Sequence, residues 1–450
     1  MASTAPQFRS QTAFIFATAA AAIGLGNIWR FPYLAGIHGG GAFVLLYVFF
    51  VLVLGIPLMA SEMFIGRTGG QSPYTAFAHI AKSQQRSHHW RYVGLIAMLS
   101  SLLILSYYLV ISGWVLDYSV HSARDYFYHM SAHQAQQHHQ QLLLNPGRMI
   151  LSDTLLTGVC IGILLLGIEK GLERTVLVLF PLFIVLMITL LVVSMFSHHF
   201  LEAVRFLFAP HFEKITAHVV LLALGQAFFS LNIGMGIVIV FSAYLPQPIN
   251  QSTCISAVIA SDTAIALLAG LIIFPIVFSH QLTPAAGPSL IFLTLPVALG
   301  HLPYGTVIGT LFFVLLLLAA FTSALSLLEV VIAGCMAIAN IKRTTAVWLL
   351  GGVAWLLSLM TIASFSHPTT WHIFGMHFFQ AFDGLTSNVL LPLGGLLTAI
   401  FCGWRIPPTF IAEKMQWNRS STRFTLWRIS NRYVAPILIS IILLATIKGI

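Results

Sequence analysis

Charged side chains are scarce in this sequence. Of its 450 residues only 7% are Asp, Glu, Lys or Arg, whereas 58% are hydrophobic. Soluble globular domains carry about 25% charged residues, so the composition excludes a soluble enzyme or binding module and indicates an integral membrane protein. Cysteine is scarce as well, and no two cysteines form a Cys-x-x-Cys pair. Because Cys160, Cys254, Cys335 and Cys402 fall within or beside apolar segments, we expect them to be small apolar fillers.

Long hydrophobic runs recur along the chain. About 20 residues are needed to cross the ~30 Å hydrocarbon core of a bilayer as a helix. We therefore predict an all-α integral membrane protein, a single transporter-sized domain over residues 1–450 with eleven transmembrane helices. The first run reads as a retained span and not as a signal peptide, because no charged segment with a cleavage site accompanies it. The runs lie at about 12–36, 41–66, 92–121, 151–168, 174–197, 218–243, 252–279, 304–338, 346–365, 372–403 and 431–448.

Positive charges gather on alternate connections between these runs. The net charge is +9. If the N-terminus is cytoplasmic, fifteen Lys and Arg residues fall on the cytoplasmic side and five on the opposite side. This asymmetry follows the positive-inside rule and predicts a cytoplasmic N-terminus and an external C-terminus. The basic residues are then topology determinants, so no nucleic-acid partner is expected. The short termini and the number of spans favour a bacterial inner membrane.

Two of the runs are interrupted by the same small motif. The first carries Gly24-Leu25-Gly26 within "AAIGLGNIWRFP", and the sixth carries Gly234-Met235-Gly236 within "FFSLNIGMGIVIV". The third and eighth runs have polar centres, at residues 106–108 and 321–326. Paired interruptions of this kind indicate an inverted-repeat transporter with discontinuous helices. We predict that helices 1–5 (about 12–197) and 6–10 (about 218–403) form the repeats, with helix 11 at about 431–448.

A broken helix needs a reason in a membrane. Unpaired backbone groups cost several kcal/mol each in lipid, so irregular backbone persists only where protein or a wet cavity satisfies it. Freed carbonyls can bind a small hard cation, which prefers oxygen ligands. The N-terminus of a half-helix can hold an anion. Asn27, directly after the first break, adds an amide oxygen. The two breaks therefore predict a site for a cation and a carboxylate.

Several motifs taken together resemble one family. "IGLGNIWRFP", "HGGGAFVLLY", "GIPLMASEMFIGR", "GQAFFSLNIGMG" and "AAFTSALSLLE" resemble, in order, those of the neurotransmitter:sodium symporters, specifically their bacterial amino-acid branch with the leucine-transporter fold. The resemblance covers about residues 8–447. It implies a secondary symporter with 5+5 inverted-repeat topology, unwound helices 1 and 6 and no organic cofactor. It also implies import of an amino acid with Na⁺ by alternating access.

The resemblance implies two Na⁺ sites. The first would use the carbonyl of Ala22, the side chains of Asn27, Ser230 and Asp262, and the carboxylate of the substrate itself. Since substrate and ion then complete each other's site, each raises the other's affinity. The second site would bridge helices 1 and 8. Its ligands would be the carbonyls of Ala20, Ile23 and Ala319 and the hydroxyls of Thr322 and Ser323.

The implied substrate site lies between the two breaks. The substrate carboxylate would contact the amides of Leu25 and Gly26 and the hydroxyl of Tyr108, and its amine would contact carbonyls of helices 1 and 6. Glycine at position 24, where amine transporters of the family carry aspartate, implies a zwitterionic substrate. The lining favours large hydrophobic or aromatic amino acids, although Asn232 could shift the preference toward a more polar side chain. The substrate-binding residues would be Ala21, Ala22, Leu25, Gly26, Ile104, Tyr108, Phe229, Ser230, Asn232, Met235, Ser323 and Leu327.

Acidic residues inside the spans are the other functional signal. A carboxylate at mid-bilayer costs roughly 2.5–3.5 kcal/mol on insertion scales. Many relatives have asparagine where this chain has Asp262 and require chloride, so we expect the Asp262 carboxylate to replace chloride. Its surroundings would include Tyr47, Gln226, Ser230 and Ala266. Glu62 matches a position that supports the broken helices, and the role of Glu329 stays open.

The resemblance also implies gates. Arg30 and Asp383 would form an external salt bridge, with Tyr108 and Phe229 as a lid beneath it. The internal gate does not carry over, because the family's arginine and aspartate align here with Ala5 and Ala337. Arg9 could replace the first of these, but no acid stands at the position of the second.

Other functions remain open at this point. A proton-coupled transporter of the same fold, a channel and a non-transporting amino-acid receptor all fit the same scaffold. An intramembrane enzyme is disfavoured because the chain has no His-Glu-x-x-His or Gly-x-Ser-x-Gly motif. His129 and His133 have a spacing compatible with a metal, although we expect this external stretch to be an ordinary polar loop. The expected partners are the amino acid, Na⁺ and the bilayer, with a homodimer as an open possibility.

Overall fold

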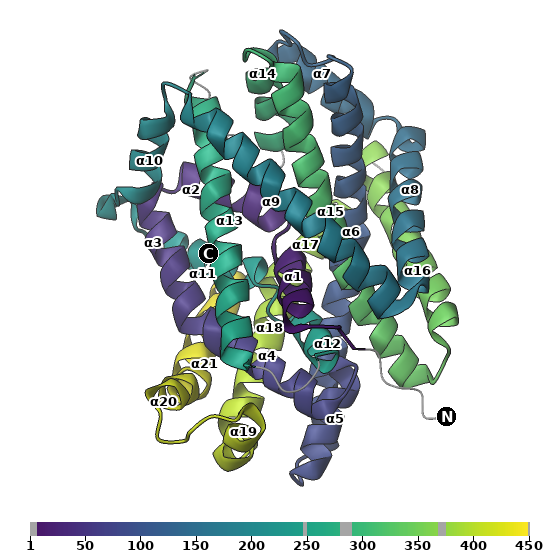
Figure 1. Ribbon diagram of the computed structural model, residues 1–450, viewed down its shortest axis with the longest axis vertical. Helices are drawn as coiled ribbons and strands as arrows, with labels where there is room; N and C mark the ends of the chain where they lie inside the picture. The colour runs from purple at the N-terminus through teal and green to yellow at the C-terminus, as the bar shows by residue number, and fades with distance from the viewer. Residues whose placement is uncertain (1–6, 246–249, 280–289, 368–374, 449–450) are drawn as a thin grey trace.

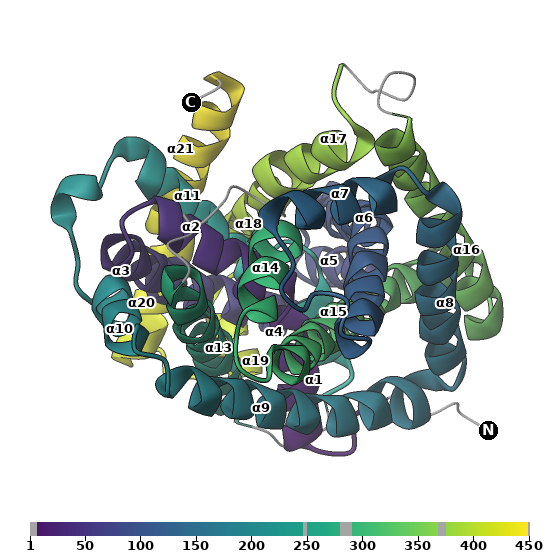
Figure 2. The same cartoon turned by 90° about the horizontal axis from the view of Figure 1, so that it is seen from above.

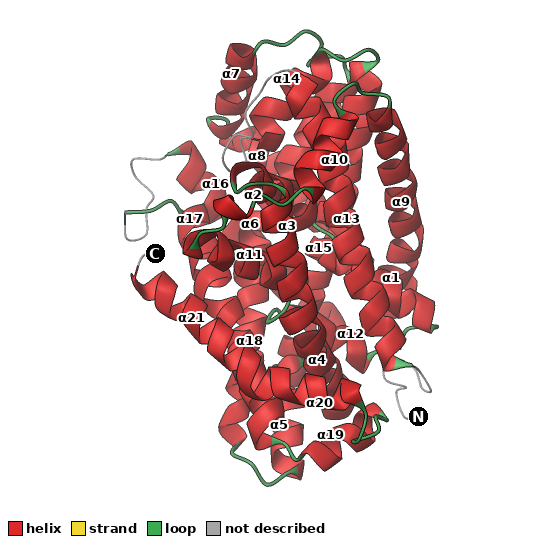
Figure 3. Ribbon diagram, turned by 90° about the vertical axis from the view of Figure 1, so that its left-hand side faces the viewer, coloured by secondary structure: helices red, strands yellow, loops and turns green. Residues whose placement is uncertain are grey.

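The structure is a computed structural model that describes residues 7–245, 250–279, 290–367 and 375–448. Within these ranges the chain is almost entirely helical and has no β-strand (Figure 3), and an isolated bridge joins Gly40 to Pro210. The helices pack as a bundle whose long axis is vertical in Figure 1. The prediction of an all-α fold is therefore confirmed.

The helices of the first half follow the predicted runs. Their bounds are α1 (Gln11–Ala22), α2 (Phe31–Ile37), α3 (Gly41–Phe50), α4 (Ile56–Gly69), α5 (Pro73–Ser83), α6 (Arg91–Ala123), α7 (Ala132–Leu143), α8 (Pro146–Leu165), α9 (Arg174–Met195) and α10 (Phe200–Phe208). Short 3₁₀ or π-helical segments between them are η1 (Gly26–Arg30), η2 (Val51–Gly55), η3 (His88–Trp90), η4 (Ile168–Glu173) and η5 (Phe212–Lys214).

The second half is built in the same way. Its helices are α11 (Ala217–Ser230), α12 (Ile237–Ala243), α13 (Gln251–Ser279), α14 (Leu295–Gly300), α15 (Gly305–Ala339), α16 (Arg343–Ser366), α17 (Phe378–Leu385), α18 (Leu391–Ile400), α19 (Pro408–Met415), α20 (Thr422–Ile429) and α21 (Ala435–Lys448). π-helical segments join them at η6 (Leu290–Thr294), η7 (Thr386–Leu390), η8 (Phe401–Arg405) and η9 (Ser430–Val434).

In the described part of the chain, nine helices are long and apolar enough to cross a membrane, and a tenth span forms if the bent pair of α1 with η1–α2 counts as one. The sixth predicted span is divided between α11 and α12, so neither piece meets that length. The count of eleven therefore stays a prediction. The last span begins already at Thr422, earlier than the predicted 431, and part of the predicted 372–403 run falls outside the described residues.

Local sequence explains where the helices begin and end. Ser10 and Thr216 accept bonds from backbone N–H groups in the first turns of α1 and α11, as N-caps do. Pro146, at the first position of α8, lacks only an N–H that the helix would leave unpaired. Asn340, which follows α15, has a left-handed backbone with φ of 50° and so ends that helix.

The arrangement of the helices defines two ends and a centre. α7, α10 and α14 lie at one end of the bundle, and α5, α19 and α20 lie at the other (Figures 1 and 3). α6 and α15 pack against each other and are the most buried of the nine candidate spans. Seen from above, α8 and α16 lie on one side and α21 lies at the periphery (Figure 2). The segment from Leu290 to Gly300 packs onto the bundle, with most of its apolar side chains buried.

Candidate ion and substrate site at two broken helices

Helices 1 and 6 are both discontinuous, as predicted from the paired glycine motifs. α1 ends at Ala22, Ile23 has an extended backbone, and the chain resumes as a helix at Gly26 with a bend of 52°. α11 ends at Ser230 and α12 begins at Ile237. Between them Asn232, Gly234 and Gly236 have φ values of 54°, 84° and 77°, which interrupt a right-handed helix.

Side chains satisfy several backbone groups exposed by the breaks. The buried Glu62 on α4 accepts a bond of 2.8 Å from the amide of Gly234. Ser101 on α6 donates to the carbonyl of Met235 at 2.7 Å, and Gln226 on α11 donates to the carbonyl of Gly26 at 3.0 Å. These bonds meet the requirement that backbone polar groups at membrane depth find a partner. They place Glu62 and Gln226 against the breaks, where the sequence expected supporting residues.

A buried carboxylate lies behind the first break. Asp262 on α13 accepts bonds from the Asn27 amide at 2.8 Å, the Ser230 hydroxyl at 2.5 Å and the Tyr47 hydroxyl at 3.1 Å. All four side chains are buried. The structure thus unites the polar side chains predicted for the first Na⁺ site and adds Tyr47. Asn27 turns its amide nitrogen toward the carboxylate, while its Oδ1 accepts from the amide of Gly24 at 3.4 Å.

A second oxygen cluster joins α1 to α15. The hydroxyl of Thr322 lies 3.0 Å from the carbonyl oxygen of Ala20 and 3.2 Å from that of Ala319. One hydroxyl proton cannot satisfy both carbonyls at once, so the cluster is rich in oxygen acceptors. Ser323, predicted for the same site, instead donates to the carbonyl of Ala21 at 3.1 Å. Ile23 lies at the break itself.

A small cavity of about 20 Å³ lies between the two breaks. It is lined by ten of the twelve residues predicted for the substrate, together with Gly24. Leu25 lines the next cavity outward, and Ser230 belongs to the Asp262 cluster. The lining residues are Ala21, Ala22, Gly24, Gly26, Ile104, Tyr108, Phe229, Asn232, Met235, Ser323 and Leu327.

Polar groups in this cavity cluster around the first break. The amide of Leu25 donates to the hydroxyl of Tyr108 at 3.0 Å. Asn232 donates to the carbonyl of Ala21 at 2.7 Å, so its amide group ties helix 6 to helix 1. A methyl group added to Gly24 would lie 2.5 Å from the Tyr108 hydroxyl oxygen. The structure therefore has no room for a side chain at position 24 beside this tyrosine.

A larger cavity of about 180 Å³ lies on the outer side of Tyr108 and Phe229, which line both cavities and so separate them. Arg30 and Asp383 both line the larger cavity. Among the described residues, however, these two do not form an ion pair. Arg30 stacks on the ring of Phe229 at 4.8 Å, and Asp383 accepts a bond of 3.2 Å from Tyr107. The predicted gate residues are thus brought to one cavity without their salt bridge.

On the other side of the two breaks lies a network that the sequence did not predict. Glu329, which is fully buried in α15, forms a two-pronged ion pair with Arg343 at 2.9 and 2.6 Å. It also accepts a bond of 2.9 Å from Tyr244, just after α12. Ala337 lies further along α15, and Ala5 lies outside the described residues. Glu329, whose role was open, therefore joins α15 to Arg343 of α16 and to Tyr244 after α12.

The segment before α1 is anchored to the same end. Phe8 is buried, and its amide donates to the carbonyl of Tyr244 at 2.8 Å. Arg9 pairs with Glu169 of η4 at 2.5 Å, and its amide lies 3.2 Å from a carboxylate oxygen of Glu173. Arg9 thus has an acidic partner, but on a connection that spacing along the sequence could not identify.

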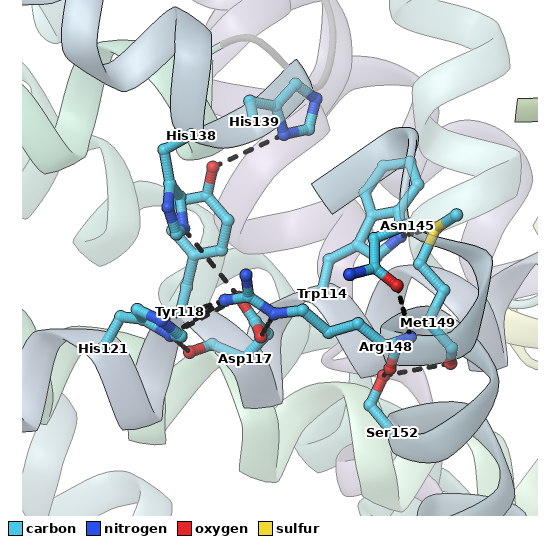
Figure 4. A network of polar contacts seen from close by, with 10 residues as sticks. All are labelled: Trp114, Asp117, Tyr118, His121, His138, His139, Asn145, Arg148, Met149 and Ser152. Atoms are coloured by element: carbon cyan, nitrogen blue, oxygen red, sulfur yellow. Dashed lines mark hydrogen bonds and ion pairs between the residues drawn. The ribbon is translucent and has the colours of Figure 1, made fainter. Parts of the chain in front are cut away.

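The histidine-rich external stretch contributes to a different network (Figure 4). Asp117 on α6 holds Arg148 of α8 through two bonds of 2.5 and 2.7 Å, and His121 lies 2.9 Å from the same guanidinium. His138 of α7 is buried, with its Nε2 3.9 Å from the Asp117 carboxylate. Burial, together with the neighbouring His121 and Arg148, lowers the pKa of His138 to about 4. Asp117, His121 and His138 are close enough to share a metal, but Arg148 already neutralises the carboxylate.

His129 and His133, the pair suggested by spacing, are not part of that group. His129 has a left-handed backbone with φ of 50°, and its amide donates to the carbonyl of Gly300. This bond ties the external stretch to α14. The ion pair in Figure 4 therefore fastens α6 to α8, and α7 joins this network through His139, whose Nδ1 lies 3.4 Å from the hydroxyl of Tyr118 on α6.

Known proteins are similar to this chain in both sequence and fold. The family model of the sodium:neurotransmitter symporters matches residues 5–135 and 120–450. The sodium-dependent transporter YhdH of Bacillus subtilis is 34% identical over 440 residues, covering 97% of each chain. A sodium-dependent transporter of Haemophilus influenzae is 32% identical over 447 residues, again covering 97% of each.

The crystal structure of MhsT in complex with L-phenylalanine superimposes with a TM-score of 0.90 at 35% identity, covering 98% of this chain and 100% of MhsT. The fold is therefore the leucine-transporter fold, with a 5+5 inverted repeat and broken helices 1 and 6. These matches indicate a sodium-dependent symporter and not an enzyme. The protein belongs to the sodium:neurotransmitter symporter family.

Proposed function

We propose that this protein imports a large hydrophobic or aromatic zwitterionic amino acid together with two Na⁺ ions. The observation that carries the proposal is the cavity between the two breaks, which is lined by Gly26 at the start of a half-helix and by apolar side chains such as Ile104 and Leu327. Half-helix N-termini favour an anionic group. The similar protein MhsT was crystallised with L-phenylalanine, which supports the same substrate class here.

Ile104, Met235 and Leu327 line the part of the cavity that would receive the substrate side chain. Met235 is flexible and can adjust to bulky groups. Asn232 is the polar exception, but one of its amide protons is already held by Ala21. The cavity is small in this conformation, so the bulky substrate requires Tyr108 and Phe229 to move outward. The small volume of the cavity thus corresponds to a state in which Tyr108 and Phe229 are closed over it.

The Asp262 cluster supports coupling without chloride. Its carboxylate would supply the fixed negative charge beside the first Na⁺ ion, and turning the Asn27 amide by 180° would present Oδ1 to the ion. The oxygen cluster of Thr322, Ala20 and Ala319 would form the second site between α1 and α15. Two Na⁺ ions that enter down a tenfold gradient and 100 mV release roughly 7 kcal/mol, enough for strong accumulation.

Alternating access would follow from the two cavities and the two ends. Tyr108 and Phe229 would close the outer side, with Arg30 and Asp383 pairing above them once substrate is bound. The Tyr244–Glu329–Arg343 network would close the inner side, which the positive charges assign to the cytoplasm of a bacterial cell. Helices 1 and 6 would move against a scaffold that contains α15 and α16.

Uptake into proteoliposomes tests the proposal. We expect accumulation of radiolabelled phenylalanine, tyrosine, tryptophan or leucine when Na⁺ is outside, no accumulation when choline replaces Na⁺, and full activity when gluconate replaces chloride. Accumulation driven by a proton gradient in choline would favour the proton-coupled alternative and exclude Na⁺ coupling. Amino-acid binding without accumulation would indicate a receptor. Loss of uptake without chloride would exclude the role given to Asp262.

A further inference from the structure

A basic cleft at the end of the bundle that carries α20 shares no lining residue with the two cavities at the helix breaks. It has a volume of about 530 Å³ and lies along one face of α20 and η9, at the start of the last span. Arg419 and Ser420 border it from the turn before α20, and Arg428 and Arg432 border it from the helix. Its remaining lining residues are Phe424, Thr425, Ile429 and Tyr433.

The three arginines of this cleft lack acidic partners. Among the described residues, none of Arg419, Arg428 and Arg432 takes part in an ion pair, whereas Arg9, Arg148 and Arg343 all do. The chain contains no Asp or Glu after Glu413. The buried Nε of Arg432 also has no hydrogen-bond partner. Arginines that line one cleft with no carboxylate in its lining suit an oxyanion, since their planar N–H groups match phosphate geometry.

Aromatic side chains place the cleft at the membrane surface. The Arg432 guanidinium stacks on Trp404 at 4.7 Å, and the indole of Trp404 donates to the Arg432 carbonyl at 2.8 Å. Trp404 and Tyr433 are both about half exposed, as expected of amphipathic rings at the level of lipid headgroups. Exposed apolar residues such as Ile437 and Ile441 follow along the same span. An oxyanion attached to acyl chains would therefore fit here better than a free one.

We propose that this cleft binds the phosphodiester headgroup of an anionic phospholipid, with its acyl chains along α21. The positive-inside rule alone does not account for a cleft lined by three arginines. That rule depends on the number of basic residues in a connection and not on whether they line one cleft. The hydroxyl group of Thr425 adds a donor that suits a glycerol-phosphate headgroup, whereas the Ser420 hydroxyl already donates to Oδ1 of Asn418 at 2.8 Å. The bound lipid would hold the interfacial helix α20 in place beside the last span.

The test is lipid binding by the full-length protein in an uncharged detergent, measured by native mass spectrometry with short-chain phosphatidylglycerol. Phosphatidylcholine of the same chain length is the lipid control. We expect the wild type to prefer phosphatidylglycerol and Arg428→Gln to weaken that preference about fivefold, the equivalent of the ~1 kcal/mol that one basic residue contributes near an anionic surface. Arg419→Gln, on an exposed turn where folding is insensitive to the change, should act in the same direction.

Arg423→Gln is the matched control. Arg423 lies on the same helix but bonds to Ser252 and lines a different cavity, so we expect no change in lipid preference. Equal losses in the Arg423 and Arg428 variants would overturn the proposal in favour of diffuse surface charge. Displacement of the lipid by millimolar inorganic phosphate, with no preference between the two lipids, would overturn it in favour of a soluble anion. Thermal unfolding in phosphatidylcholine verifies that each variant is folded.

Discussion

We expect Tyr244→Phe to open the inner side of this transporter without unfolding it. Tyr244 donates its hydroxyl proton to the buried Glu329 at 2.9 Å, and the phenylalanine ring would fill the same space. Glu329 keeps its two bonds to Arg343 in the variant, so no buried charge is left unpaired. The change therefore removes one contact between helix 6 and the scaffold and little else.

The size of the effect follows from the kind of bond. A hydrogen bond to a charged group contributes about 1.5–3 kcal/mol, and each 1.4 kcal/mol is a factor of ten in an equilibrium constant. The ratio of inward-open to inward-closed molecules should rise about 10- to 150-fold. Glu329→Gln should be harsher, because removing one partner of a buried ion pair costs about 3–5 kcal/mol.

Hydrogen exchange measured by mass spectrometry provides the assay. Phe8 bonds to the carbonyl of Tyr244, so release of this residue should loosen the start of α1. In Na⁺ without substrate, amides of residues 8–22 should exchange at least about tenfold faster in Tyr244→Phe, while those of α15 stay protected. Tyr92→Phe, on the exposed surface of α6, is the control. Unchanged exchange over residues 8–22 would refute the assignment of this network to inner closure.

Three further predictions concern the site and the external network. Asp262→Asn should lower the apparent Na⁺ affinity of uptake about 5- to 1000-fold in gluconate, since a charge at ~4 Å contributes about 1–4 kcal/mol between bulk water and an effective dielectric near 20, and chloride should restore part of it. Gly24→Ala should weaken amino-acid binding about 5- to 150-fold in equilibrium binding assays, because overpacking costs about 1–3 kcal/mol and the added methyl group would meet Tyr108. His138→Gln should remove part of the loss of thermal stability between pH 6.5 and 4, while His139, whose pKa burial also lowers to about 4, keeps another part. The folded-state pKa of His138 is about 4, so only the unfolded chain takes up this proton as the pH falls through 6.5, which disfavours folding by about 3 kcal/mol at the acidic limit.

Each of these has a matched control. Chloride that fails to rescue Asp262→Asn would contradict the idea that the carboxylate stands in for an anion. Gly352→Ala changes a helical glycine with open space around it, so equal loss of binding there would show a general packing effect. His133→Gln changes an exposed histidine of the same external helix. If it flattened the pH dependence as much as His138→Gln, burial of His138 would not be the cause.

The helix breaks could be read from the sequence because their cause is local. Two Gly-x-Gly motifs at matching places in two halves predict discontinuous helices wherever the surroundings satisfy the backbone. The residues that bond to the exposed backbone groups were partly predictable too. Glu62 is an acid inside a span, where a carboxylate is costly and therefore indicates a specific polar partner. Asn232 is different. Its left-handed backbone and its bond to Ala21 depend on how helices 1 and 6 meet, which spacing along the chain does not encode.

The inner network shows why the rest was missed. The positions that carry arginine and aspartate elsewhere in the family are Ala5 and Ala337 here, and two alanines do not indicate which other residues form the ion pair. Glu329 and Arg343 lie on consecutive helices that fold back at Asn340, so they meet only after α15 and α16 form a hairpin. In the same way Asp117 and Arg148 meet across the ends of α6 and α8. Histidine spacing drew attention to His129 and away from this pair.

The carbonyl of Ala21 accepts two hydrogen bonds from different parts of the transporter. Asn232 holds it from helix 6, which would travel with helix 1, whereas Ser323 holds it from α15, which would stay behind. If helices 1 and 6 move as a unit, the bond from Asn232 stays intact, whereas the bond from Ser323 must break and re-form in every transport cycle. That recurrent rupture, of order 1 kcal/mol for a neutral pair, sits one residue from Thr322. Na⁺ binding at the neighbouring oxygens would therefore control when helices 1 and 6 separate from α15.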